Sequence, residues 1–136
     1  MKKYLLDTCV CISMFRNEGS VRDIILKVGT KNCYISEITL AELYFGLAKS
    51  ENKKKKLEDI KQVQGLFKVL PAFSSFREYG EIRYNLEHKG MRIDQFDLLI
   101  GATAVHYGMT LVTSNEKHFE RIESLAIENW RNVPHS

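Results

Sequence analysis

Short apolar runs alternate with longer amphipathic segments along the chain, and the two patterns predict strands and helices in turn. The short runs predict strands at Tyr4–Leu6, Asn32–Ile35, Lys68–Leu70, Met109–Thr113 and Leu125–Ile127. The longer segments predict helices at Cys9–Phe15, Val21–Val28, Glu37–Ala48, Leu57–Phe67, Ser74–Lys89 and Asp94–Tyr107, with one helical turn at Phe119–Ile122. Because strands that alternate with helices form βαβ units, we expect an α/β fold with a central parallel sheet of about five strands.

The composition is that of a single globular domain spanning residues 1–136. Hydrophobic residues make up 44% of the chain and charged residues 27%, and the length allows an ordinary core. No apolar run approaches the roughly 20 residues of a membrane-spanning helix, and Tyr4–Leu6 is too short for the core of a signal peptide. We therefore expect a cytoplasmic protein without membrane contact.

The cysteines and histidines do not form a recognisable metal-binding motif. An odd cysteine count without a secretion signal argues against disulfides and favours small buried side chains at Cys9, Cys11 and Cys33. The histidines lack the spacing of a metal site and are assigned to the surface or to packing: His88, His106, His118 and His135.

The formal net charge is +3, a mild basic bias that is compatible with a polyanionic partner without indicating one. The run Lys53–Lys56 has two interpretations. It forms a solvated turn or exposed helical face, or it contacts phosphate groups together with Arg83, Lys89 and Arg92.

Three carboxylates lie in apolar surroundings. Asp7 ends the run Tyr4–Leu6, Glu42 lies among the apolar residues of the helix Glu37–Ala48, and Asp97 is followed at once by apolar residues. An ionised carboxylate removed from water is unfavourable unless it is paired, hydrogen-bonded or bound to a metal. One shared cation would compensate all three.

Chain order brings these acids toward one edge of the expected sheet. In an open parallel α/β sheet, the strand C-termini and the following helix N-termini share the edge where ligands bind. Asp7 follows the first strand, Asp97 lies in the first turn of its helix, and residues 113–115 follow the fourth strand. Glu42 is about two helical turns into its helix and is expected to lean over the same crevice. Mg²⁺ and Mn²⁺ prefer such hard oxygen ligands.

Each acid also has a purely structural interpretation. Asp7 is a favoured N-cap for the helix after it, and Asp94 and Asp97 have the N-cap and N3 spacing of a capping box. Glu42 lies three residues after Thr39 and fits the same motif at a later helix start. Capping accounts well for Asp94, whereas the combination of the other acids favours a shared cation.

Six segments carry a wider pattern: Leu5–Thr8, Ile35–Leu43 with Gly46, Phe96–Ala104, Gly108–Asn115, Phe119–Ile122 and Glu128–Trp130. In order and spacing they resemble the PIN-domain ribonucleases, and among these the VapC-like toxins of type II toxin–antitoxin pairs. The resemblance covers nearly the whole chain. It implies a three-layer α/β/α sandwich around the parallel sheet, and hydrolysis of RNA phosphodiesters with Mg²⁺ or Mn²⁺.

The resemblance also implies roles for individual residues. Asp7, Glu42 and Asp97 correspond to the metal-binding acids of the family, with Glu42 a direct or water-mediated ligand. A fourth acid of the family corresponds to Asn115, which we include among the candidate catalytic residues although it brings no charge. Asp94 and Glu116 are alternatives for completing the site.

Two further residues and one departure concern the same place. Thr8 and Thr113 are candidates for orienting waters or metal ligands. Cys9 stands where many relatives have Asn, which changes a polar contact near the first acid.

Relatives of this kind act on structured RNA, so the resemblance implies a tRNA or ribosomal RNA substrate. It also implies a homodimer and a cognate antitoxin protein. The antitoxin would fill a groove formed by the helices that span residues 9–28 and 37–67.

Two other functions are compatible with parts of the chain. Phosphoryl transfer through an Asp7 nucleophile usually requires a second Asp two residues later, where this chain has Cys9. A catalytically weak or inactive PIN-domain RNA-binding protein is the main alternative, and Asn115 is the residue that favours it.

Overall fold

The sheet at the centre of the molecule has five parallel strands. A computed structural model describes residues 2–131, so the prediction for His135 lies outside the described residues. The strands are β1 (Tyr4–Leu6), β2 (Cys33–Ser36), β3 (Lys68–Leu70), β4 (Thr110–Val112) and β5 (Ile127–Glu128). Their spatial order is β3-β2-β1-β4-β5, and every neighbouring pair is parallel. The expected parallel sheet is confirmed.

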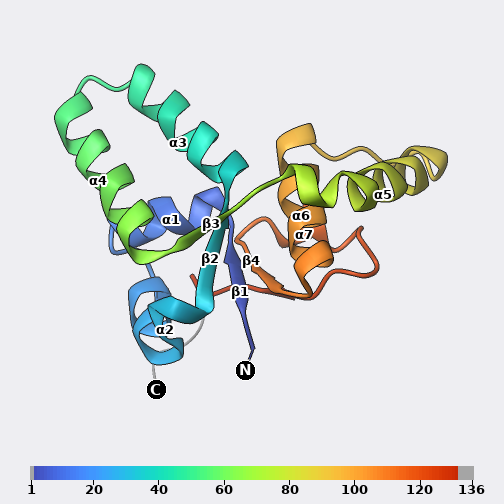
Figure 1. Cartoon of the computed structure of the whole chain (residues 1–136), viewed down its shortest axis with the longest axis horizontal. Coiled ribbons are helices and arrows are strands. Elements are labelled where there is room, and N and C mark those ends of the chain that lie inside the picture. The colour runs from blue at the N-terminus through green and yellow to red at the C-terminus, as the bar shows by residue number, and fades with distance from the viewer. Residues whose placement is uncertain (1, 132–136) are drawn as a thin grey trace.

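Helices cover both faces of the sheet, and each face has its own hydrophobic core (Figure 1). One layer contains α1 (Thr8–Phe15), α2 (Val21–Val28), α3 (Glu37–Ala48) and α4 (Lys53–Leu66), and the other contains α5 (Phe76–His88), α6 (Gln95–Tyr107) and α7 (Glu116–Phe119). Short 3₁₀ helices lie at Thr30–Asn32 and Phe73–Ser75. Because successive strand side chains point to opposite faces, Leu6 packs into the first core and Leu5 into the second. The three-layer α/β/α sandwich is therefore confirmed.

The order of the strands defines one crevice at their carboxyl ends. The chain builds the sheet outward from β1 through β2 to β3, and then returns to add β4 and β5 on the other side of β1. In such sheets the crevice lies where the strand order reverses, which here is between β1 and β4. Leu6 is paired with Val112, so Asp7 and Thr113 leave the sheet side by side.

The basic run is where the helix boundaries differ most from the prediction. The helix expected to begin at Leu57 begins at Lys53, because the Asn52 side chain caps it by accepting from the Lys55 N–H at 3.2 Å. Lys53 Nζ donates to the carbonyl oxygens of Leu47, Ala48 and Ser50 at 3.3, 2.8 and 2.9 Å, which satisfies the end of α3. Lys55 pairs with the buried Asp59 at 2.8 Å. Half of this run therefore has a structural role rather than being freely solvated.

A second difference lies after β4. The helical turn expected at Phe119–Ile122 lies earlier, as α7, because the Asn115 carbonyl accepts from the N–H groups of His118 and Phe119. β5 also lies later than expected, since the pairing with β4 joins Leu111 to Ile127. Leu125 packs as a buried core residue before that strand begins.

Two predictions from composition concern burial. Cys11 and Cys33 are buried, as predicted, whereas Cys9 is only partly buried. Across residues 2–131, the structure contains no helix of the length and apolar character that crossing a membrane requires.

Candidate active site

Asp7 is the carboxylate at the centre of the crevice. It follows the middle strand, is 2% exposed, and continues the sheet by donating its N–H to the Val112 carbonyl at 2.9 Å. Its Oδ1 accepts from the Thr8 N–H at 2.8 Å, which makes it the N-cap of α1 as the structural interpretation predicted. Its Oδ2 accepts from the Thr113 hydroxyl at 2.8 Å and from the Cys9 thiol at 3.5 Å. Capping therefore uses only one of its two oxygens.

Thr113 and Cys9 form a small polar network behind Asp7. Thr113 is fully buried, and its Oγ1 also accepts from the Asn115 N–H at 3.0 Å. Cys9 Sγ lies 3.8 Å from Thr113 Oγ1 and accepts from the Ser114 hydroxyl at 3.2 Å. The position after Asp7 and Thr8 thus keeps a polar contact to the first acid through sulfur. The sequence signalled this only through the position of Cys9, two residues from an acid at a helix start.

Glu42 reaches the same place from α3. This helix begins at Glu37 with Ser36 as its N-cap, since the Ser36 hydroxyl accepts from the Ile38 N–H at 3.1 Å. The alternative in which Glu42 completes a capping box with Thr39 is therefore wrong. Instead Glu42 Oε1 accepts from the Thr8 hydroxyl at 2.5 Å, so the residue after Asp7 links two of the three acids.

Asp97 approaches from α6. Asp94 is the N-cap of this helix and accepts from the N–H groups of Phe96 and Asp97 at 3.1 and 3.4 Å, so capping explains it as predicted. The Asp97 side chain remains only 17% exposed and lies 3.7 Å from His118 Nδ1. His118 is exposed, in agreement with its assignment to the surface or to packing. Its contact with an acid of the site was not predicted, because the helical turn was expected later in the chain.

The three acids raise one another's proton affinity. Burial raises the pKa of Asp7, and the charge of Glu42 adds to this effect against the hydrogen bonds from Thr113, Thr8 and Cys9. Burial, followed by the charges of Asp97 and Asp94, raises the pKa of Glu42 against the hydrogen bond from Thr8. Burial and then the charges of Asp7 and Asp94 raise the pKa of Asp97 to about 6, although His118 opposes the shift. The crevice therefore gathers carboxylates whose ionised forms disfavour one another.

The donor set fits a divalent cation held mainly by two carboxylates. Within residues 2–131, no three His, Cys, Asp or Glu side chains are close enough together to form a complete metal site. Mg²⁺ is usually bound through one or two carboxylates, with waters and substrate phosphate completing its shell. Asp7 and Asp97 supply hard oxygens, and the ion pairs of the described residues include neither Asp7 nor Glu42. The charges of Asp7 and Glu42 are therefore available to such an ion.

Asn115 lies at the rim of the crevice rather than at its centre. Its backbone N–H contacts Thr113, while its side chain is exposed. It lines a polar hollow next to the acids together with Ser114, Glu116, Lys117, His118 and Asn129. Glu116 is also exposed there, and Asp94 is engaged as a cap. The structure thus places Asp7, Glu42 and Asp97 in one crevice, where their charges act on one another, but within residues 2–131 they are not close enough to form a complete three-ligand site. Asn115 and Glu116 lie at its edge.

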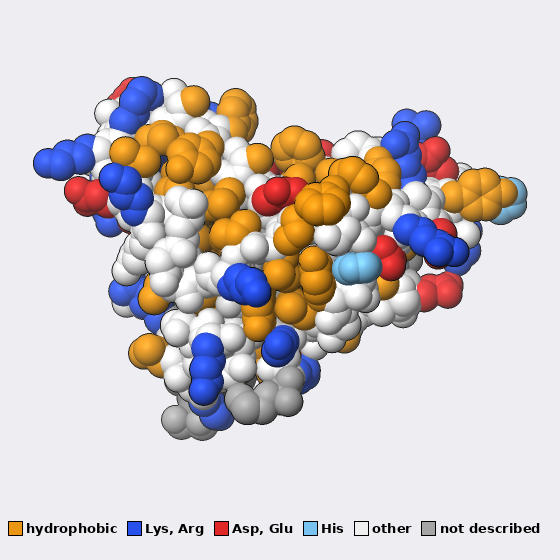
Figure 2. Space-filling view, viewed as in Figure 1, with side chains coloured by type: hydrophobic (Ala, Val, Ile, Leu, Met, Phe, Trp, Pro, Cys, Tyr) orange, Lys and Arg blue, Asp and Glu red, His pale blue; other side chains and the backbone are white. Residues whose placement is uncertain are grey.

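Two apolar grooves lie among the helices α1 to α4, and Glu42 lines one of them. One is framed by α1, α3 and α4 and is lined by Ile12, Phe15, Glu42, Leu43, Gly46, Lys56, Asp59 and Ile60. The other is framed by α1, α2 and α4 and includes Leu26, which is 77% exposed. Figure 2 shows hydrophobic side chains gathered over the region where α3 and α4 pack together. These grooves lie between the helices from which we expected an antitoxin groove.

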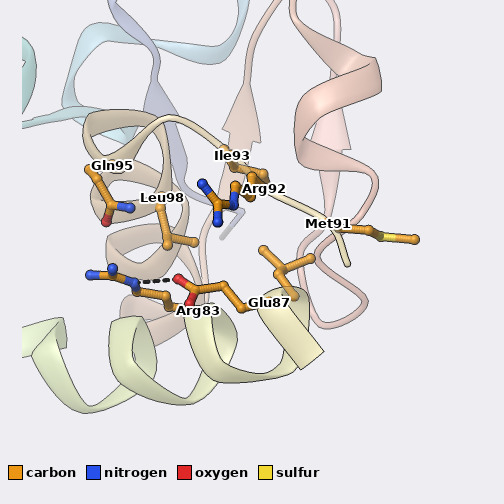
Figure 3. A pocket seen from close by; sticks show the side chains of 8 residues that line it. Arg83, Glu87, Met91, Arg92, Ile93, Gln95 and Leu98 are labelled. Carbon is orange, nitrogen blue, oxygen red and sulfur yellow. Dashed lines mark hydrogen bonds and ion pairs between the residues drawn. The ribbon is translucent and has the colours of Figure 1, made fainter. Parts of the chain in front are cut away.

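A further pocket lies between α5 and the start of α6 (Figure 3). Arg83 Nε donates to Glu87 at 2.7 Å there, so the charge of this guanidinium is already neutralised. Gln95 lines the pocket, and Asp97 is two residues further along α6, which places them on opposite sides of the helix. The carboxylates therefore define the candidate active site, and this pocket lies outside it.

Comparison with known proteins gives a consistent result. A family model described as the PIN domain matches residues 4–125. The chain is 35% identical over 131 residues to ribonuclease VapC2 of Rickettsia felis, covering 93% of this chain and 97% of that protein. It is 34% identical over 132 residues to the tRNA(fMet)-specific endonuclease VapC of Shigella flexneri, covering 96% and 99%. The crystal structure of DNA-bound VapBC from Salmonella typhimurium matches with a TM-score of 0.88 at 32% identity, covering 96% of this chain and 99% of that chain.

Proposed function

The chain belongs to the PIN-domain family, and on this premise we propose that it is a metal-dependent endoribonuclease acting as the toxin of a toxin–antitoxin pair. Relatives that match along nearly their full length carry the names ribonuclease and endonuclease, which supports an endoribonuclease. The observation that carries the proposal is that Asp7, Glu42 and Asp97 share one crevice, where the Thr113 hydroxyl holds Asp7, the Thr8 hydroxyl holds Glu42, and the charge of Asp7 acts on Asp97.

The residues of the crevice have distinct roles in this proposal. Asp7 and Asp97 hold Mg²⁺ or Mn²⁺, and Glu42 binds the ion directly or through a water. The bound ion supplies polarisation of the phosphodiester and activation of a water. Thr113 and Cys9 fix the Asp7 carboxylate, and Thr8 fixes Glu42, so both acids are oriented before the ion arrives. Asn115 at the rim positions a water or substrate.

We propose a structured RNA such as tRNA as the substrate, with ribosomal RNA as the second choice. One relative is named as a tRNA(fMet)-specific endonuclease, which supports tRNA first. The antitoxin is proposed to occupy the apolar grooves framed by α1, α2, α3 and α4, since a solved relative is a toxin–antitoxin complex. We expect the protein and its antitoxin to act in the cytoplasm.

We also propose that the toxin is a homodimer. Large aromatic side chains are exposed on the surface, with Phe45 66% and Phe73 67% accessible, and a second copy would cover such residues. Light scattering of the purified chain tests this, because a monomer at micromolar concentration would contradict the proposal.

RNA cleavage tests the main proposal. Purified protein is incubated with total tRNA in Mg²⁺, in EDTA, and as the variants Asp7→Ala and Asp97→Asn. We expect cleavage only in Mg²⁺ and a loss of about a hundredfold or more in either variant, comparable with removal of a transition-state donor. Glu58→Gln, at an exposed position of α4, is the matched control and keeps full activity.

The alternative function is a weak or inactive PIN-domain RNA-binding protein. This alternative is supported by Asn115, which places an exposed, uncharged amide where the resemblance implies a fourth acid. The same assay separates the two. Wild-type protein that binds tRNA but leaves it intact at every Mg²⁺ and Mn²⁺ concentration would support the alternative and end the proposal of catalysis.

A further inference from the structure

We propose that the polar hollow beside the carboxylates binds the nucleotide next to the scissile phosphodiester. Asn129 hydrogen-bonds to the base of this nucleotide, and Lys117 contacts its phosphate. This inference rests on the proposed function and adds a substrate subsite to it. The hollow is lined by Ser114, Asn115, Glu116, Lys117, His118 and Asn129, which come from the start of α7 and the segment after β5.

The hollow adjoins the crevice of acids. Ser114 on its wall donates to Cys9 at 3.2 Å, and Cys9 in turn donates to Asp7 at 3.5 Å. On the same wall, His118 Nδ1 lies 3.7 Å from Asp97 Oδ2. The lining of the hollow is therefore linked to Asp7 through Cys9, and it contacts Asp97 directly through His118. In the proposal, a phosphate at the acids has its adjacent nucleotide in this hollow.

The lining has the chemistry that a nucleotide requires. Lys117 is exposed, and the ion pairs found among residues 2–131 do not include it, so its charge can meet a phosphate. Asn129 Oδ1 accepts from the Arg131 N–H at 2.9 Å, which orients the side chain and leaves its amide hydrogens for a ligand. Carboxamides pair with base edges, and proteins read RNA on such splayed single-stranded bases.

The contrast with the apolar grooves supports a nucleotide over a peptide. The groove framed by α1, α3 and α4 presents Ile12, Phe15, Leu43 and Ile60, whereas the hollow has only polar and charged residues in its lining. A peptide partner gains much of its affinity by burying its side chains against apolar ones, and the residues that line the hollow include none of these. The two sides of the acids thus suit two different kinds of ligand.

Binding to short RNA in a non-cleaving background tests the subsite. The Asp97→Asn protein is titrated against fluorescein-labelled homopolymers of A, C, G and U, each about eight nucleotides long. Asn129→Ser is the chosen variant because a serine hydroxyl still accepts from the Arg131 N–H while the amide is removed. Lys117→Ala removes the charge. Asn85→Ser and Lys31→Ala, both at exposed positions outside the hollow, are the matched controls.

We expect Asn129→Ser to weaken binding of one homopolymer by about tenfold, leaving the others within about threefold, because one base contact is lost. We expect Lys117→Ala to weaken all four by a similar factor and to reduce the salt dependence by about one phosphate contact. If both variants bind all four homopolymers as the Asp97→Asn parent does, the subsite is wrong.

Cleavage by the protein with Asp97 intact reports separately on the proposed function. If the protein never cleaves RNA but its base preference changes with Asn129→Ser, the subsite is supported and the proposed nuclease activity is wrong. If Asn129→Ser and Lys117→Ala leave tRNA cleavage at limiting substrate unchanged, the nuclease activity is supported and the subsite is wrong.

Discussion

The Thr113 hydroxyl donates to Asp7 Oδ2 at 2.8 Å across 106 residues of sequence, and both residues are almost completely buried. This bond joins the ends of the two strands that flank the crevice. We expect Thr113→Val to lower the free energy of unfolding by about 1–3 kcal/mol, since a buried carboxylate loses a donor. Mn²⁺ affinity, measured by calorimetry, should fall by about tenfold because the carboxylate is no longer oriented. Thr113→Ser keeps the hydroxyl and should retain both; equal losses in the two variants would contradict this role.

Asp97 should destabilise the metal-free protein at neutral pH. Its pKa in the folded state is about 6, above that of an unfolded Asp at about 3.9, so the native state binds more protons between these values. Stability then falls as the pH rises through this window. In EDTA we expect Asp97→Asn to raise the free energy of unfolding by about 1–2 kcal/mol at pH 8 and by almost nothing below pH ~4. Urea unfolding at both pH values measures this, and a gain that does not depend on pH would refute it.

Lys53 should stabilise the turn between α3 and α4, although it belongs to a run that resembles a phosphate-binding patch. Its ammonium group donates to the carbonyls of Leu47 and Ala48 at the end of α3 and to that of Ser50 just after it. We expect Lys53→Met to lower stability by about 0.5–1 kcal/mol, as for a lost cation at a helix C-terminus. Lys54→Met is the matched control because Lys54 is exposed, and the side-chain hydrogen bonds and ion pairs found within residues 2–131 do not include it. Equal melting temperatures for the two variants would show that the contact contributes nothing.

Gly19 should tolerate substitution much less well than Gly90, although both have positive φ. A Cβ at Gly19 would lie 2.1 Å from the Arg131 carbonyl oxygen, whereas a Cβ at Gly90 meets nothing within 4 Å. Gly90→Ala incurs only the left-handed backbone strain, about 1 kcal/mol. We expect Gly19→Ala to lose at least about twice as much, because backbone must move as well. Chemical denaturation of both variants measures the difference, and similar values would argue against this close approach.

The sequence predicted those parts of the molecule that depend on local pattern. Alternating apolar runs predicted the parallel sheet, and the position of an acid just after a strand or at a helix start predicted where Asp7 and Asp97 lie. The contact between Thr8 and Glu42 was not predictable, because it depends on how α1 packs against α3. The role of His118 was missed for a similar reason: a shift of α7 by three residues decides which side chain faces Asp97. The structural role of Lys53 was not predicted, because a run of lysines has the same sequence whether its side chains contact water or carbonyl groups.

The strand order also has a consequence for protein synthesis. Asp7 is synthesised 106 residues before Thr113, and the strand that completes its surroundings is residues 110–112. A nascent chain from which residues 110–113 have not yet emerged has neither the crevice nor the hydroxyl that holds Asp7. The catalytic centre of the proposed toxin therefore assembles only after these residues have left the ribosome.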